Sequence, residues 1–344
     1  MSVALLLVGL FIGSFLLVAG LRHYALRRQL VDIPNARSSH VIPTPRGGGL
    51  AFVLCSLVAL LLLCAWGGLT QAMAMSLLGA AGSVALVGFV DDHRHVPARW
   101  RLLGHAAAAC WALYWLGGLP AMVVAGHPIE LGWLGQILAV LYLVWLINLY
   151  NFMDGINGLA AIEGVFVTLS AVVCYVLAGV AEMAEVLIAP EVILATTVAA
   201  FLCWNFPQAR IFMGDVGSGF LGVFLGILSL RAASLEPTLW WSWLILLGVF
   251  IVDATFTLLH RLWRGEAIHQ AHRSHAYQAA ARRFGSHVPV TLSVLAINVG
   301  WLLPWALLVA TRQVTEVVGL IASYLPLITF AWLLGAGRPE RATS

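Results

Sequence analysis

The sequence predicts an all-α fold, a polytopic membrane bundle of about 10–11 transmembrane helices, and its composition is the main reason. Of the 344 residues, 61% are hydrophobic and only 10% are charged, whereas soluble domains carry about 25% charged residues. The mean hydropathy is +0.95. A membrane-spanning helix needs about 20 mostly apolar residues, and such segments recur along the chain. Residues 1–344 are therefore expected to form a single integral membrane domain.

Eleven apolar segments match this length, and the first is expected to be a retained helix because it lacks the features of a cleaved signal peptide. The shorter segments at 134–150 and 217–231 leave the count open to ten. Five scattered cysteines without CxxC spacing are expected to be buried thiols, with neither disulfides nor zinc. The segments are 3–21, 48–66, 72–90, 103–121, 134–150, 158–180, 188–204, 217–231, 238–259, 288–311 and 317–336.

The arginines predict the orientation of the bundle. All 18 basic residues are arginine, and 16 of them fall in alternate loops and the tail, against two on the opposite side. Loops rich in positive charge stay in the cytoplasm, so we expect a periplasmic N-terminus. The cytoplasmic loops 22–47, 91–101, 205–216 and 260–287 are expected to form one active-site face in a bacterial inner membrane.

The aspartates lie on the same predicted side, each at one end of an apolar segment. Carboxylates are costly near a hydrocarbon core, so their repeated placement at helix ends indicates a function. The six are Asp32, Asp91, Asp92, Asp154, Asp215 and Asp253.

The pair Asp91–Asp92 in GFVDDHRH closes the third segment. Adjacent carboxylates repel each other, so the pair is expected where a cation or a transferable proton offsets the repulsion. A solvated, capped helix end is the alternative. In NLYNFMDGINGLA, polar side chains occur every third residue, from Asn148 through Asn151 and Asp154 to Asn157, as on one stripe of a helix. An ordinary interfacial turn is the alternative there.

Two further motifs favour phosphate chemistry. In MGDVGSGFLG, Asp215 precedes a helix whose first turn would attract phosphate, and its carboxylate would hold Mg²⁺. A plain N-cap is a compatible alternative. His269, His272 and His275, with Arg273 among them, are expected to face a diphosphate. A zinc site and contact with anionic lipid headgroups are the alternatives.

In this order, VDIPNARSSHVIPTPRGGGLAF, GFVDDHR, NFMDGINGLA, MGDVGSGFLG and HRSHAYQ resemble the polyprenyl-phosphate N-acetylhexosamine-1-phosphate transferases. The resemblance covers residues 30–285 and implies transfer of a sugar 1-phosphate from a UDP-sugar to undecaprenyl phosphate, with release of UMP and with Mg²⁺ (Mn²⁺ as the alternative ion). It implies initiation of O-antigen, a step of lipopolysaccharide biosynthesis, or of another envelope glycan. Phospho-N-acetylmuramoyl-pentapeptide transferase is the alternative within the family. Membrane lipids are further partners, a homodimer is left open, and no nucleic acid is expected.

The resemblance also implies roles for individual residues. Asp91 and Asp92 match the pair that deprotonates or positions the lipid phosphate, and Asp215 and Asn151 match magnesium contacts. Asn157 matches a residue facing uracil, and its amide, where pentapeptide transferases carry Asp, argues for the O-antigen branch. The family often reads His-x-His-His in its last loop, of which this chain keeps only the first, at His275. The substrate-binding set is Asp154, Asn157, Arg46, Arg99, Arg101, His272, Arg273 and His275.

A secondary transporter of anionic substrates is the alternative from another class, because it would also combine many helices with glycine-rich breaks and polar groups. Transporters place those groups near the middle of the membrane. In this sequence nearly all of them lie at one predicted surface, which favours the enzyme.

Overall fold

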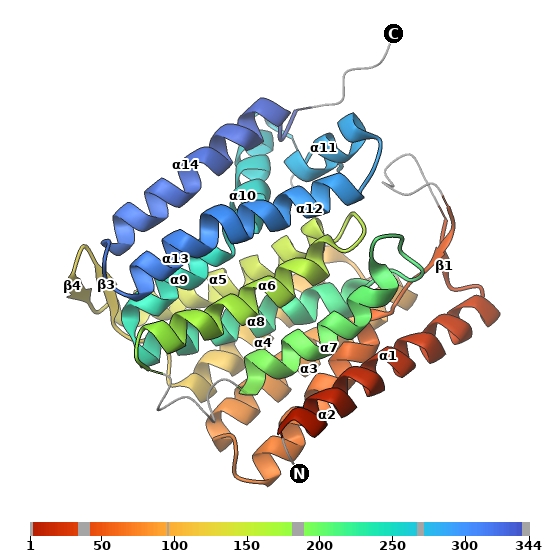
Figure 1. Cartoon of the computed structure of the whole chain (residues 1–344), viewed down its shortest axis with the longest axis horizontal. Helices are drawn as coiled ribbons and strands as arrows, with labels where there is room; N and C mark the ends of the chain where they lie inside the picture. Colours follow the sequence, from red (N-terminus) through yellow and green to blue (C-terminus); the bar gives the residue numbers. More distant parts are fainter. Residues whose placement is uncertain (1–2, 34–41, 95, 181–188, 267–271, 339–344) are drawn as a thin grey trace.

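The computed structural model describes residues 3–33, 42–94, 96–180, 189–266 and 272–338, and in them the predicted all-α fold is confirmed (Figure 1). A helix corresponds to each predicted apolar segment. The helices are α1 (Val3–Arg27), α2 (Gly49–Ala65), α3 (Gln71–His93), α4 (Ala98–Leu116), α5 (Gly132–Met153), α6 (Leu159–Leu177), α7 (Ala189–Asn205), α8 (Asp215–Leu235), α9 (Pro237–Leu246), α10 (Gly248–Trp263), α11 (Ala276–Phe284), α12 (Val288–Ile297), a π-helical turn (Asn298–Leu302), α13 (Leu303–Ala310) and α14 (Glu316–Leu334).

Two short antiparallel hairpins complete the described elements. Strands β1 (Val31–Asp32) and β2 (Thr44–Pro45) pair beside the end of α1, and β3 (Met122–Val124) pairs with β4 (His127–Ile129). The two hairpins lie at opposite ends of the bundle (Figure 1). They therefore mark the two surfaces toward which the helices run.

Seven helices of the described chain are long and apolar enough to cross a membrane, and the bent pair α9–α10 would make an eighth. Helices α2 and α7 are apolar but shorter, with 17 residues each. The predicted segments are thus all helical, while fewer of them meet both criteria of length and hydropathy. The result is a multi-pass membrane bundle.

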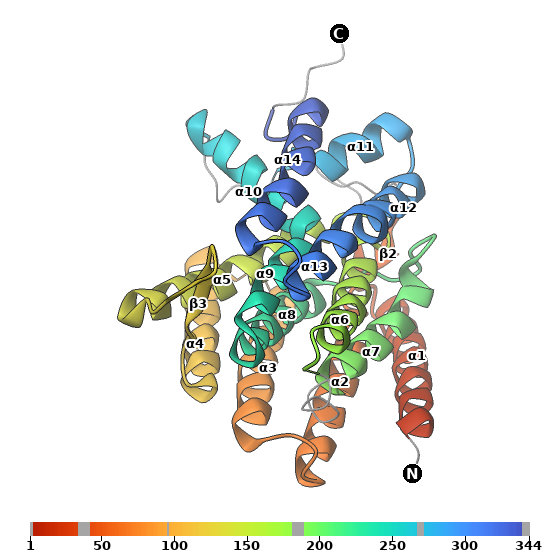
Figure 2. The ribbon, with the colours of Figure 1, turned by 60° about the vertical axis from the view of Figure 1, so that its left-hand side comes forward.

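The segment predicted at 238–259 is not one helix. It divides at Leu247 into α9 and α10, whose axes differ by 69°. Gly248 follows the break, and a side chain there would press on Tyr324, Leu302 and Leu327 at 3.2–3.3 Å. Figure 2 shows α10 running at an angle to the bundle. Because of this bend, Asp253 is buried within α10 and does not lie at a helix end, so that expectation was wrong.

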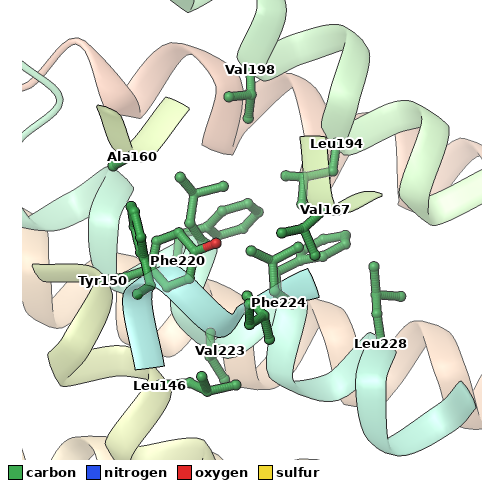
Figure 3. Close-up of a cluster of buried hydrophobic side chains, with 14 of the residues drawn as sticks. Leu146, Tyr150, Ala160, Val167, Leu194, Val198, Phe220, Val223, Phe224 and Leu228 are labelled. Carbon is green, nitrogen blue, oxygen red and sulfur yellow. The ribbon is translucent and has the colours of Figure 1, made fainter. Parts of the chain in front are cut away.

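Helix α8 is the central element, and nearly all of its residues are buried. Its phenylalanines pack against side chains of α5, α6 and α7, among them Tyr150, Val167 and Leu194 (Figure 3). The backbone of α5 touches α8 at Gly222, where a β-carbon would overlap the carbonyl oxygen of Leu146. This packing fixes the position of Asp215, the first residue of α8.

Candidate active site

The carboxylate of Asp91 faces the start of α4. Its Oδ1 accepts a hydrogen bond from the backbone N–H of Val96 at 2.8 Å, and its Oδ2 accepts one from Arg101 Nη1 at 2.6 Å. A charge-assisted bond of this length is among the stronger polar contacts in proteins. Asp91 therefore holds Arg101 at the end of α3.

The carboxylate of Asp92 points the other way, into the protein, and caps α8. Its Oδ1 and Oδ2 accept hydrogen bonds from the backbone N–H groups of Asp215 and Val216, both at 3.1 Å. A carboxylate at a helix N-terminus satisfies free N–H groups and complements the helix dipole. Arg46 donates to the backbone carbonyl of Asp92. The two neighbouring aspartates thus have different surroundings, and Asp215 is not the cap of its own helix.

The carboxylate of Asp215 meets groups from three other helices. Its Oδ1 accepts a hydrogen bond from Asn151 Nδ2 of α5 at 2.7 Å, and its Oδ2 lies 3.6 Å from Arg101 Nη1 of α4. The carboxyl group of Asp91 from α3 is also in contact with it. Arg101 Nη1, 2.6 Å from Asp91 and 3.6 Å from Asp215, supplies positive charge where these two carboxylates would otherwise repel each other.

A small cavity of about 40 Å³ lies among these groups, and it suits one ion or one water molecule. Asp91, Asp215 and Asn151 line it, and so does His105, whose Nδ1 is buried without a partner in the described part of the chain. Mg²⁺ prefers oxygen ligands and is usually held by one or two carboxylates with substrate phosphates. No described group of three or more His, Cys, Asp or Glu side chains could hold a metal alone. The carboxylates of Asp91 and Asp215 would be the ligands of a magnesium that phosphate oxygens complete, whereas Asn151 turns its Nδ2, a donor, toward Asp215 in this structure.

A larger cavity of about 770 Å³ adjoins the small one, because Arg101, Asn148, Asn151 and Phe152 line both. Its walls are apolar and come from α4, α5 and α10. The other lining residues are Ala98, Leu102, Leu141, Val144, Trp145, Gly155, Leu258, His272, His275, Tyr277 and Gln278.

The histidines of this larger cavity are held by Asp253. Asp253 Oδ1 lies 3.3 Å from His275 Nδ1, and its two oxygens accept hydrogen bonds from the backbone N–H groups of Ala276 and Tyr277 at the start of α11. His272 stacks on His275 with ring centroids 4.9 Å apart. Burial lowers the pKa of His272 to about 4, and the charges of His275 and Arg261 add to this shift. His272 is therefore a neutral hydrogen-bonding group at neutral pH.

Asp154 and Asn157 lie in the turn between α5 and α6. Burial raises the pKa of Asp154 well above its usual value, and the nearby carboxylates of Asp215 and Asp92 raise it further. Asp154 consequently keeps its proton to a higher pH than an exposed aspartate. Asn157 lines a different cavity, of about 460 Å³, together with Phe212 and His287.

The structure brings some predicted residues together and separates others. Arg101, Asn151, His272 and His275 share the large cavity. Arg99 instead lies on the exposed side of α4 with its guanidinium 5.8 Å from the Trp100 ring. Arg273 and Arg282 line another cavity, of about 210 Å³, which shares Gln278 with the large one. His269 lies outside the described residues.

Three residues of this region were not predicted as site residues. Asp253 holds the histidine segment, His105 lines the small cavity, and Asn148 lines both adjoining cavities. Asn148 belongs to the stripe of polar residues noted in the sequence, and Asp253 is the one carboxylate in its apolar segment. These two sequence features could have indicated Asn148 and Asp253 as site residues.

Gly88 allows α3 to approach the start of α8, and this contact yields a prediction. A β-carbon at Gly88 would overlap the backbone of Asp215, whereas one at Gly82 of the same helix would find its nearest neighbour 4.0 Å away. We expect Gly88→Ala to reduce turnover by at least tenfold, because it separates Asp91 from Asp215 by moving a backbone. Gly82→Ala should keep turnover within about twofold, since Ala is the better helix former. Equal activity of the two variants would contradict the assignment.

The fold and the site define a multi-pass helical membrane protein with carboxylates, an arginine and histidines around adjoining cavities. Residues 73–233 match glycosyl transferase family 4. The chain is 32% identical to a probable undecaprenyl-phosphate N-acetylglucosaminyl 1-phosphate transferase of Bacillus subtilis over 282 residues, which are 80% of this chain and 75% of that protein. The chain belongs to this family.

Two other relatives carry names of the same kind. A decaprenyl-phosphate N-acetylglucosaminephosphotransferase of Mycolicibacterium smegmatis is 34% identical over 67% of this chain and 60% of its own length. A phospho-N-acetylmuramoyl-pentapeptide-transferase of Moorella thermoacetica is 33% identical over 66% of this chain and 74% of its own length. The relatives thus include N-acetylglucosamine-phosphate transferases and a pentapeptide transferase.

Proposed function

We propose that the chain transfers an N-acetylhexosamine 1-phosphate from a UDP-sugar to undecaprenyl phosphate and releases UMP. The observation that carries the proposal is the convergence of Asp91, Arg101, Asn151 and Asp215 in a small cavity that adjoins a larger, mostly apolar one. At its rim, Leu102 and Leu141 are 54% and 58% exposed, as expected of side chains that face lipid. A lipid phosphate has the matching chemistry, with an apolar chain and an anionic head.

The cavity lined by Asn157 supports the binding of a nucleotide. Asn157 offers an amide and Phe212 an aromatic ring along one space of about 460 Å³. A nucleobase needs both a hydrogen-bonding group and an apolar surface in its pocket. UDP is therefore the part of the donor that we assign to this cavity.

The reaction requires two anionic phosphate groups to approach each other, so the residues act mainly by positioning and charge. Arg101, held by Asp91, supplies positive charge at the junction of the cavities. His272 and His275 line the same cavity as Arg101, and each carries an imidazole that can donate a hydrogen bond. Mg²⁺ held by Asp91 and Asp215 would neutralise further phosphate charge, with Asn151 orienting Asp215 through its hydrogen bond.

Among the alternatives, the amide of Asn157 favours the O-antigen type of transferase, and the Moorella relative keeps the peptidoglycan type as second candidate. A transporter is disfavoured because the aspartates of the site lie at helix ends: Asp91 in the last turn of α3, Asp154 directly after α5 and Asp215 at the start of α8.

The test is UMP release by the purified protein with undecaprenyl phosphate. UDP-GlcNAc, UDP-FucNAc, UDP-QuiNAc and UDP-MurNAc-pentapeptide should be compared, with EDTA and then restored Mg²⁺ or Mn²⁺ as metal controls. Turnover of the pentapeptide substrate alone would replace the O-antigen assignment with the peptidoglycan one. Absence of UMP release with every donor would overturn the proposed function.

The arginine distribution further predicts that the active site faces the cytoplasm. Ser286 and His127 are both exposed, and they lie at the two ends of the bundle, beside α11 and in β4. In a variant without the five native cysteines, Ser286→Cys and His127→Cys should react with a membrane-impermeant thiol reagent from opposite sides. In intact cells we expect labelling at position 127 only. Labelling at position 286 only would show that the protein has the opposite orientation in the membrane.

A further inference from the structure

Asn157 is held at its backbone by two side chains from the start of α12. Its N–H donates a hydrogen bond to His287 Nδ1 at 3.4 Å, and its carbonyl oxygen accepts one from Thr291 Oγ1 at 2.9 Å. Thr291 is fully buried, and His287 lines the same cavity as Asn157. Both polar backbone groups of a cavity residue are thus bound by one distant helix.

The side chain of Asn157 is oriented as well. Its Nδ2 donates a hydrogen bond to the carbonyl oxygen of Pro207 at 3.2 Å. The amide cannot turn over without losing this bond. Asn157 therefore offers a ligand its Oδ1, an acceptor, and the second hydrogen on Nδ2, a donor.

This arrangement distinguishes the pyrimidine bases. Uracil carries an N3–H donor beside carbonyl acceptors, which complements an acceptor next to a donor. Cytosine carries an unprotonated N3 beside an amino group, so it would set acceptor against acceptor and donor against donor. The distinction depends on how accurately the amide is held.

Helix α12 is a firm support for this contact. Asn298 lies two turns after Thr291, and its Nδ2 donates a hydrogen bond to Glu163 Oε2 of α6 at 2.5 Å. Both of these side chains are fully buried. In an apolar interface, such a bond opposes sliding of one helix along the other, because sliding would leave two polar groups unpaired. The position of α12 relative to α6, which begins just after Asn157, is therefore fixed.

We propose that His287 and Thr291 are positioning residues that set the nucleobase preference of this site by holding Asn157. The proposal rests on the proposed function, because it takes the cavity of Asn157 as the nucleoside site. Neither residue needs to touch the reacting phosphates, and Thr291 acts entirely through Asn157.

The test compares Thr291→Val, which is nearly isosteric but removes the hydroxyl, with Thr291→Ser, which keeps the hydroxyl and removes only a methyl group. Dissociation constants for UMP and CMP are measured by calorimetry with the purified full-length protein, and KM for undecaprenyl phosphate is measured alongside. We expect Thr291→Val to weaken UMP binding about fivefold and to narrow the preference for UMP over CMP, as loss of one backbone contact implies. Thr291→Ser should restore both. His287→Leu and His287→Asn form a second pair with the same expected contrast.

The lipid-phosphate KM should stay unchanged in all four variants. If Thr291→Val and His287→Leu both keep the wild-type preference for UMP over CMP, the proposal is overturned. It is also overturned if Thr291→Val and Thr291→Ser weaken UMP binding equally and the loss of affinity simply follows the loss of melting temperature. Failure of the wild-type protein to bind UMP or to release it would instead overturn the proposed function, so the two failures are distinguishable.

Discussion

Asp215→Ala is expected to abolish turnover while leaving the protein folded. Asp215 contacts Asn151 and Arg101 directly and lines the cavity suited to a metal ion. Loss of a ligand to an ion that stabilises charge in the transition state should lower kcat by at least 100-fold. The melting temperature should stay close to that of the wild type. The variant loses the hydrogen bond from Asn151, but it also loses the repulsion between the carboxylate of Asp215 and those of Asp91 and Asp92.

The measurement is UMP release together with thermal unfolding in detergent. Glu236→Gln is a matched control, since it removes a carboxylate that pairs with Arg312 outside the site, and it should leave turnover unchanged. Asp215→Asn should also raise the Mg²⁺ concentration needed for any residual activity. Retention of more than a tenth of wild-type turnover would exclude the role, because tenfold corresponds to only about 1.4 kcal/mol.

The helices could be predicted because apolar length is a property of the sequence alone. Every predicted segment is helical, but neither the division at Leu247 nor the π-helical turn Asn298–Leu302 within segment 288–311 was predicted. Residues 238–259 form a continuous apolar run without an internal proline. The break depends on how Gly248 packs against Tyr324, Leu302 and Leu327, which come from parts of the chain more than 50 residues away. Periodicity contains no information on such contacts.

The site was predicted by residue type, but the direction of its side chains was not. Asp91 and Asp92 are adjacent in sequence, and successive residues of an α-helix point about 100° apart. Which of them faces Arg101 and which faces α8 depends on the rotation of α3, which packing at Gly88 decides. The contact between Asp253 and His275 likewise depends on the bend before α10. The motifs therefore predicted which residue types the site combines, and only the fold shows which of their atoms are in contact.

This division predicts different outcomes for Asp91→Asn and Asp92→Asn. Asp92 holds two backbone N–H groups at the start of α8 with both of its oxygens. Asn provides only one acceptor, so Asp92→Asn should lower the free energy of unfolding by about 1.5–3 kcal/mol, the range for a hydrogen bond to a charged group. Turnover should fall with it, because Asp215 lies on the same turn. A drop in melting temperature is the expected sign of this role.

Asp91→Asn should lower the melting temperature less than Asp92→Asn does, because Arg101, the charged group that loses its partner, is 34% exposed to solvent. It should lower kcat by at least 100-fold, with little change in the KM for the UDP-sugar. Asp91 contacts Arg101 and Asp215, the groups that we assign to the phosphates. A phosphate monoester with a second pKa near 6 is mostly dianionic at pH 7, so a general base is not required there.

Kinetics from pH 6 to 9 separate the two possible roles of Asp91, as a general base or as a positioning group. A flat profile for the variant would indicate that the carboxylate positions Arg101 or the metal. Recovery as the pH rises would show that deprotonation of the acceptor was the missing step. Normal turnover of Asp91→Asn at pH 7 would mean that the carboxylate serves only to end α3.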